Sequence, residues 1–197
     1  MVAGHLFLSL LASAAPLSTQ DQCEAHVFTT DEVTGFTSLG DYGLLTDLFS
    51  GGAVPEEALR AQIRVDSQFE ISSALMDRPG RLEGFEFVEN NSPVAFRTSY
   101  RQKQRLTESE QQCYVEIVIN YIAFSDTAIS KKKVGVHFVT RDFRDNPDKP
   151  RILKLGGSAA IAPYIQDGAS EGEPPSVDYV AVYTEAFEQA IKRFWRD

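Results

Sequence analysis

One segment limits the fold of this chain more than any other: Cys113–Phe124, with the sequence CYVEIVINYIAF. In an extended conformation this run is apolar on both faces except at Glu116 and Asn120. A strand of that kind must be covered on both sides, so we predict that it lies at the centre of a sheet. Val134–Phe143 follows after a short connection and is predicted to pair with it as an antiparallel neighbour.

Further strands are predicted before and after this central one. Apolar and polar residues alternate without interruption over Arg60–Ile71, which is typical of a strand with one solvent-exposed face. Two turn signals, Asp-Arg-Pro-Gly and Asn-Asn-Ser-Pro, precede two more predicted strands, Leu82–Val88 and Val94–Leu106. Ile152–Leu155 is predicted as a short last strand, and the Gly-, Ala- and Pro-rich stretch Gly156–Pro175 as a long surface loop.

Helices are predicted near both ends of the chain. Tyr42–Phe49 suits a short helix that ends at a pair of glycines. A longer C-terminal helix is predicted to begin at Ser176, which follows two prolines and suits an N-cap. Its apolar stripe consists of Val180, Thr184, Phe187, Ile191 and Phe194.

Together these elements predict an α+β fold, a curved antiparallel sheet of about six to seven strands packed against a long C-terminal helix. The element order resembles the helix-grip arrangement, in which a curved antiparallel sheet wraps a final helix. That resemblance implies a pocket between the sheet and the helix. A small apolar ligand or lipid held in such a pocket would contact residues such as Phe69, Phe85, Phe96 and Phe187.

The N-terminus has the layout of a secretory signal peptide. An apolar run, Leu6–Ala12, is followed by small residues, although no Lys or Arg precedes it. The run is far shorter than the roughly 20 residues that cross a bilayer, so we predict export without stable membrane insertion. We expect a signal peptide over about residues 1–18 and a single α+β domain over residues 19–197, located in the periplasm or secreted.

The sequence contains two cysteines, Cys23 and Cys113. In an exported protein two cysteines most simply form one disulfide bond. Cys23 lies just before a candidate first strand and Cys113 opens the central strand, so the bond would join the N-terminus of the mature chain to the sheet. The four residues before Cys23 are polar, which argues against lipid attachment at this cysteine.

The formal net charge is −9, and no Lys or Arg occurs before Arg60. An acidic chain of this kind is not expected to bind nucleic acid. Positive charge gathers instead on the predicted strand Val94–Leu106, where one face carries Arg97, Arg101, Lys103 and Arg105. This face is either a solvated surface that discourages edge pairing or an anion-recognising surface. In the second case an acidic protein, a lipid headgroup or a polyanionic envelope polymer would bind there.

Catalytic signals are weak. The stretch around Ser158 is similar to a nucleophile elbow, but the last histidine, His137, precedes this serine, whereas the elbow fold places its histidine afterwards. We therefore interpret the stretch as a loop, and His137 as a structural residue. No group of Cys, His or carboxylate residues has metal-ligand spacing, so no metal or cofactor is predicted.

These observations favour an exported, non-enzymatic binding or accessory protein of a bacterial-type cell envelope. Its partner would be an unidentified protein or a small apolar ligand. A carrier that holds an apolar ligand between sheet and C-terminal helix is the alternative. A small hydrolase that uses Ser158 or an acidic residue is a third possibility.

Overall fold

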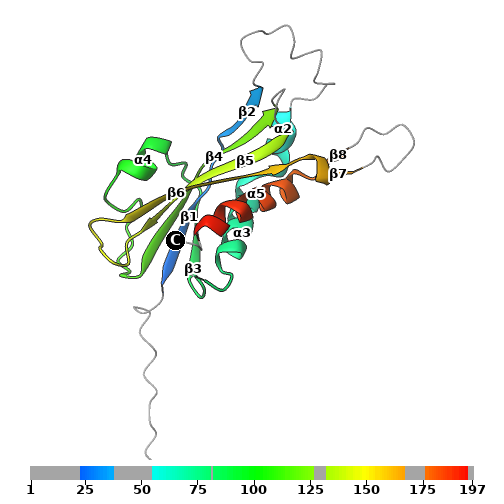
Figure 1. Ribbon diagram of the computed structural model, residues 1–197. Coiled ribbons are helices and arrows are strands. Elements are labelled where there is room, and N and C mark those ends of the chain that lie inside the picture. Colours follow the sequence, from blue (N-terminus) through cyan, green and yellow to red (C-terminus); the bar gives the residue numbers. More distant parts are fainter. Residues whose placement is uncertain (1–22, 38–54, 81, 127–131, 167–175, 195–197) are drawn as a thin grey trace, which may run out of the picture.

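The computed structural model describes residues 23–37, 55–80, 82–126, 132–166 and 176–194. Its centre is a six-stranded sheet with the strand order β3-β1-β4-β5-β6, in which β2 also pairs with β4 (Figure 1). The strands are β1 (Glu24–Phe28), β2 (Val33–Thr37), β3 (Glu86–Asn90), β4 (Tyr114–Asp126), β5 (Lys133–Asp142) and β6 (Arg151–Ala160). The α+β class is confirmed, and the predicted signal peptide and the helix over residues 42–49 lie outside the described residues.

Half of the sheet is parallel, which corrects the prediction of an antiparallel sheet. β1 runs parallel to both β3 and β4, and β2 runs parallel to β4. Parallel neighbours require connections that cross over a face of the sheet. Within the described residues, the connection from β1 to β3 contains β2 and two helices, and the connection from β3 to β4 contains a third helix.

The helices lie on both faces of the sheet, as Figure 1 shows. The α-helices of the described residues are α2 (Pro55–Gln62), α3 (Val65–Met76), α4 (Phe96–Arg101) and α5 (Tyr179–Phe194). Phe138 of β5 stacks on Phe187 of α5, with ring centroids 4.6 Å apart. The adjacent residue of the strand, His137, contacts Phe96 of α4, with ring centroids 5.3 Å apart. Neighbouring residues of a strand point to opposite faces, so α4 and α5 lie on opposite sides of the sheet. We call the side of α2, α3 and α5 the inner face and the side of α4 the outer face.

The antiparallel half of the sheet follows the sequence prediction closely. β4 is the predicted central strand, and β5 pairs with it antiparallel, with a register shift between Ile119 and Tyr121. β6 is longer than predicted, because the strand continues through Gly156 to Ala160 and pairs with β5 along its whole length. The prediction of a loop beginning at Gly156 is therefore wrong for these residues.

β1 and β2 lie end to end beside β4, and a buried side chain bridges the gap between them. β1 pairs with the first half of β4 and β2 with the second half. In the gap, the side chain of Gln68 accepts a hydrogen bond from Thr30 N at 3.0 Å and donates one to Thr30 O at 2.8 Å. Gln68 belongs to α3 and is 1% exposed, so it satisfies backbone groups that would otherwise be buried without a partner.

The predicted strand Arg60–Ile71 is instead the end of α2 and the first half of α3. The helices are separated at Arg64, whose backbone is extended (φ −75°, ψ 163°). The buried side chains of α3 recur at helical spacing and continue beyond the alternating window, at Gln68, Ser72, Leu75 and Met76. The alternation was therefore produced by two short helices read as one segment.

The predicted strand Val94–Leu106 is also wrong. Its first part forms the short helix α4, and residues 102–111 continue as an irregular segment across the outer face. The preceding predicted strand is confirmed in part, since β3 begins at Glu86 after a turn in which Gly84 has a positive φ of 77°. Only glycine adopts such a backbone conformation without strain.

The C-terminal helix is confirmed, but its N-cap is Asp178, two residues after the predicted Ser176. Asp178 caps α5, because its Oδ1 accepts a hydrogen bond from Ala181 N at 3.0 Å. Ser176 and Val177 form the strand β8 (Ser176–Val177), which pairs with β7 (Ile165–Gln166) after the short 3-10 helix η2 (Ala162–Tyr164).

The space between α5 and the sheet is filled by side chains. Phe138, Tyr183 and Phe187 are each 0% exposed there. At Gly157 of β6 the contact is closer still, since an added Cβ would lie 2.0 Å from Ala186 O of α5. The described side chains therefore leave no cavity between α5 and the sheet for the ligand of the carrier alternative.

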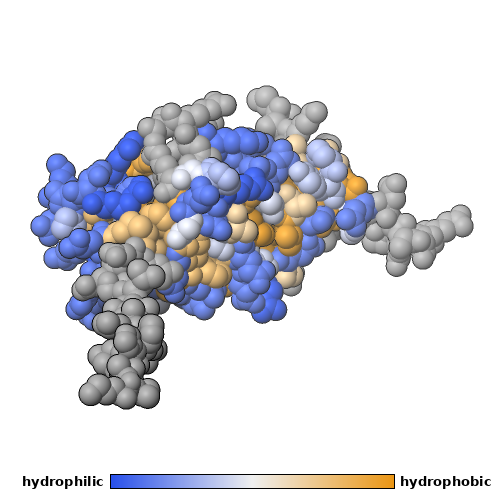
Figure 2. All heavy atoms as spheres, turned by 90° about the horizontal axis from the view of Figure 1, so that it is seen from below, coloured by the Kyte–Doolittle hydropathy of each residue, from blue (hydrophilic) through white to orange (hydrophobic). Residues whose placement is uncertain are grey.

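On the surface shown in Figure 2, hydrophilic residues surround a band of more hydrophobic ones.

The predicted disulfide bond between Cys23 and Cys113 is present, with a Cα–Cα distance of 4.6 Å. It joins the residues directly before β1 and β4, and Glu24 N donates a hydrogen bond to Cys113 O at 2.9 Å beside it. The bond therefore fixes two parallel neighbours at their shared end. Within the described residues, no helix is both long and apolar enough to span a bilayer.

Removal of this disulfide bond should destabilise the protein substantially. The two cysteines are 90 residues apart, so the bond restricts a long loop in the unfolded chain. The double variant Cys23→Ser, Cys113→Ser is expected to lose up to about 4–5 kcal/mol of unfolding free energy. Urea unfolding of this variant and of the oxidised protein measures the difference. A loss below about 1 kcal/mol would contradict this role.

Candidate functional site

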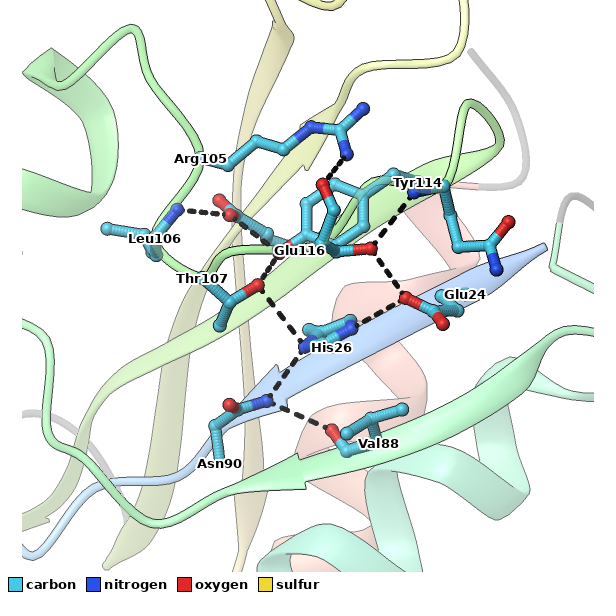
Figure 3. Close-up of polar contacts among 11 residues, drawn as sticks. Glu24, His26, Val88, Asn90, Arg105, Leu106, Thr107, Tyr114 and Glu116 are labelled. Atoms are coloured by element: carbon cyan, nitrogen blue, oxygen red, sulfur yellow. Dashed lines mark hydrogen bonds and ion pairs between the residues drawn. The ribbon is translucent and has the colours of Figure 1, made fainter. Parts of the chain in front are cut away.

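The outer face of the sheet is divided into two regions. One is a buried charge cluster, of which Figure 3 shows Glu24, His26, Tyr114 and Glu116, and the other is an open groove. The charge cluster consists of Glu24, His26, Tyr114, Glu116 and Arg141. It lies beneath residues 102–111, which we call the covering segment.

An ion pair between Glu116 and Arg141 forms the centre of the charge cluster. Both side chains are 0% exposed. The carboxylate of Glu116 also accepts hydrogen bonds from Leu106 N at 2.5 Å and from the Tyr114 hydroxyl at 3.0 Å. Arg141 Nη2 donates to two backbone carbonyls of the covering segment, those of residues 102 and 104, at 2.7 and 2.6 Å. The pair therefore anchors the covering segment to β4 and β5.

Burial determines the direction of the pKa shifts of Glu116, Arg141 and Tyr114. Removal from water raises the pKa of Glu116, although the neighbouring guanidinium of Arg141 opposes the shift. Burial likewise lowers the pKa of Arg141 and raises that of Tyr114. Arg105 lies over the ring of Tyr114, with its guanidinium carbon 4.4 Å from the ring centroid. These directions reflect the cost of burying charge, which only a partner of opposite sign offsets.

His26 lies at the edge of the cluster between two elements. Asn90 Nδ2 lies 3.2 Å from His26 Nδ1 and can only donate, so His26 Nε2 carries the proton and donates to Glu24 at 3.0 Å. Burial tends to raise the pKa of Glu24, but hydrogen bonds from Ser109 and His26 outweigh it and lower the pKa. Thr107 Oγ1 is 3.5 Å from His26 Nδ1.

Glu24, His26 and Thr107 follow one another in the order carboxylate, imidazole, hydroxyl, as in a proton relay. The likeness does not extend beyond this order. His26 is 8% exposed, and the Thr107 hydroxyl forms a short hydrogen bond with Tyr114. Ser109, also in the covering segment, donates to Glu24 at 2.7 Å. Each of these contacts attaches the covering segment to the sheet, so we interpret the cluster as structural.

The substitution Glu116→Gln should destabilise the protein by about 3–5 kcal/mol, because it leaves the buried Arg141 without a carboxylate. The double variant Glu116→Gln, Arg141→Met should lose less than the sum of the two single variants, since the contact is shared. Urea unfolding measures both quantities. The control Asp66→Asn, which removes the exposed ion pair with Arg64, should cost less than about 1 kcal/mol. Equal effects of Glu116→Gln and the control would contradict the anchoring role.

The second region is a groove of about 580 Å³. Most of its lining comes from outward-facing residues of three neighbouring strands, and two residues of α5 line it beyond the edge strand β6. The lining residues are Tyr121, Ala123, Ser125, Lys133, Gly135, Val136, His137, Gly156, Gly157, Ser158, Gln189 and Lys192. In the sheet register, Gly135 pairs with both Ala123 and Ser158, and His137 pairs with both Tyr121 and Gly156. The floor of the groove is thus made of small side chains.

Two glycines of this floor are not required by packing. A Cβ added at Gly135 would have its nearest neighbour at 3.6 Å, and one at Gly156 at 3.5 Å, both ordinary contact distances. Gly157, between α5 and the sheet, is different, because a Cβ there would collide with the helix backbone. Glycine weakens a strand and often marks a place where a ligand or another backbone approaches closely.

One end of the groove is aromatic. The rings of Tyr121 and His137 stack 5.3 Å apart at an interplanar angle of 5°, and Phe96 of α4 meets His137 edge-on. His137 Nδ1 is buried and has no hydrogen-bond partner in the described structure. Burial lowers the pKa of His137, and the positive charge of Lys154 lowers it further. Burial and Lys154 thus favour the neutral form of His137, whose ring forms an aromatic wall of the groove.

The residues of the predicted anion-recognising surface do not lie on one strand. Arg97 and Arg101 are exposed on α4 and are four residues apart, on one side of that helix. Lys103 is exposed just after it. Arg105 is separate from these three, because it donates to Ser109 O within the covering segment. The covering segment therefore removes Arg105 from the predicted surface.

The four phenylalanines predicted to line a pocket are not brought together. Phe187 lies in the inner core, and Phe69 and Phe85 pack against that core from its margin. Phe96 is on the outer face and is 40% exposed. Sequence reasoning therefore missed the groove, although strand alternation over the predicted segment Val134–Phe143 puts Gly135 and His137 on one face.

Ser158 lies inside β6 rather than on a strand-to-helix turn, so the nucleophile-elbow geometry is absent there. Ser158 and His137 line the same groove, but no hydrogen bond joins their side chains among the described residues. The described part of the chain also holds no group of three or more His, Cys, Asp or Glu residues arranged to bind a metal ion. No protein-family model and no curated protein matches this sequence.

Proposed function

We propose that the protein is an exported binding protein, and that its binding site is the groove on the outer face. The observation that carries this proposal is the floor of the groove, where Gly135 and Gly156 occupy strand positions that would accommodate a larger side chain. The aromatic wall and the flanking lysines supply contacts for a ligand. A concave site of this volume with a few polar groups is typical of ligand binding.

The proposal of export rests on two observations. The N-terminal sequence has the layout of a signal peptide over about residues 1–18. The described chain contains a disulfide bond, which is typical of proteins outside the cytosol. The remaining residues, 19–197, would form the mature domain, and its ligand or partner would be encountered in the periplasm or outside the cell.

Export can be tested by producing the full sequence in a Gram-negative bacterium. We expect the protein in the periplasm or the medium, with an intact mass reduced by about 18 residues. Its mass should not change on alkylation without a reductant, because both thiols are in the disulfide bond. A full-length chain that remains in the cytosol with two alkylated thiols would contradict export.

Binding can be tested with the fluorescent aromatic anion 8-anilinonaphthalene-1-sulfonate. The oxidised protein should enhance its fluorescence, and Gly135→Val or Gly156→Val should weaken binding about tenfold by filling the floor of the groove. Circular dichroism should show an intact fold for both variants, because valine suits a strand. The matched control Ala74→Val, at an exposed position of α3, should bind as the unchanged protein does. Equal binding by all four proteins would show that the groove is not the site.

A further inference from the structure

Among the described residues, the charged side chains at the groove are all positive. Lys133 and Lys192 line it, and Lys154 lies on the same face of β6, two residues before Gly156. None of these three lysines forms an ion pair with another described residue. In a protein of net charge −9, a groove with unpaired lysines and no carboxylate among its described lining residues attracts anions.

The aromatic side chains add a second requirement. Phe96 exposes 40% of its surface beside His137, and the half-buried ring of Tyr121 lines the groove. The Lys154 ammonium lies 3.9 Å from the ring centroid of Tyr100, which fixes the lysine next to this aromatic end. A ligand that fits here combines negative charge with the C–H-bearing face of a ring, which packs on aromatic rings.

The dimensions of the groove favour an extended ligand. In the sheet register, Lys133 pairs with Ala160 and Lys154 pairs with Val139. The two lysines are therefore six residues apart along β5, or about 20 Å. Between them lies the floor of small residues. Sites for small molecules enclose most of the ligand, whereas this groove is open along the outer face.

From charge, ring faces and length together, we infer that the ligand is an acidic oligosaccharide, a chain of sugar rings that carry carboxylate or sulfate groups. This inference rests on the proposed function, because it assigns a ligand to the same groove. The sugar rings lie over Gly135 and Gly156, their C–H faces contact Phe96 and Tyr121, and their anionic groups pair with Lys133 and Lys154. An acidic peptide would match the charges but not the ring faces.

Isothermal titration calorimetry of the oxidised protein tests this assignment. The probes are an oligogalacturonate, a sulfated dextran oligomer, a neutral cello-oligosaccharide of equal length and poly-L-glutamate. We expect binding of one or both acidic oligosaccharides, weakened by added salt, and at least about tenfold weaker binding of the other two probes. Carboxylate and sulfate ligands are then distinguished by which acidic oligosaccharide binds more tightly.

The variants test each contact separately. Lys133→Gln and Lys154→Gln should each weaken binding about two- to fivefold, and Phe96→Ala about two- to tenfold. The matched control Lys149→Gln, an exposed lysine between β5 and β6, should leave affinity unchanged. Equal affinity for poly-L-glutamate or for the neutral oligosaccharide would overturn the inference. If only the fluorescent anion binds in the groove, this inference is wrong and the proposed function stands; if neither it nor any oligosaccharide binds, both are wrong.

Discussion

The ion pair between Glu116 and Arg141 determines what covers the outer face of the sheet. Both charges are fully buried, and a buried charge is tolerated only when it is paired and hydrogen-bonded. Backbone groups of the covering segment supply further partners for the pair: Leu106 N donates to Glu116, and Arg141 Nη2 donates to the carbonyls of residues 102 and 104. Arg141 Nε is buried without a partner in the described structure. The sheet and the covering segment therefore stabilise each other. Without the segment, the buried charges would lack hydrogen-bond partners. Without the charges, the segment would have little apolar surface with which to pack on the sheet.

A second polar residue of the same strand places α4. Asn120 Nδ2 donates to Ser99 Oγ of α4 at 3.0 Å, and both side chains are almost completely buried. Phe96, at the start of this helix, then lies against His137. The covering segment occupies one half of the outer face, and α4 stops beside the groove. Glu116 and Asn120 of β4 thus account for where the outer face is covered and where the groove begins.

These contacts explain how much of the fold the sequence could predict. β4, β5, α5 and the disulfide bond were predicted because each depends on a local pattern that its own residues carry. The helix pair α2–α3 was missed because a window of twelve residues combined the end of one helix with the start of the next, and their separate periodicities summed to an apparent alternation. α4 was missed because its position depends on Asn120, which is more than twenty residues away in sequence.

The predicted site failed for the same physical reason. Alternation assigned Arg97, Arg101, Lys103 and Arg105 to one face, but the chain turns after α4 and Arg105 becomes part of the covering segment. A signal for the outer-face contacts was nevertheless present. Glu116 and Asn120 are polar residues in an otherwise apolar strand, and such residues require buried partners that a sequence pattern cannot identify.

The glycines of β5 and β6 have two different roles, one in packing against α5 and one in forming the floor of the groove. Gly157 is fixed by the contact with α5, whereas Gly135 and Gly156 weaken the strands by roughly 0.5–1 kcal/mol each without serving that contact. At the opposite half, the disulfide bond and the buried ion pair hold β1, β4 and β5 together. A sheet fixed at one half can tolerate weak strand positions in the other. The disulfide bond and the ion pair therefore stabilise one half of the sheet, and the groove lies in the other half. This arrangement explains how an ordered sheet can contain a floor of small residues.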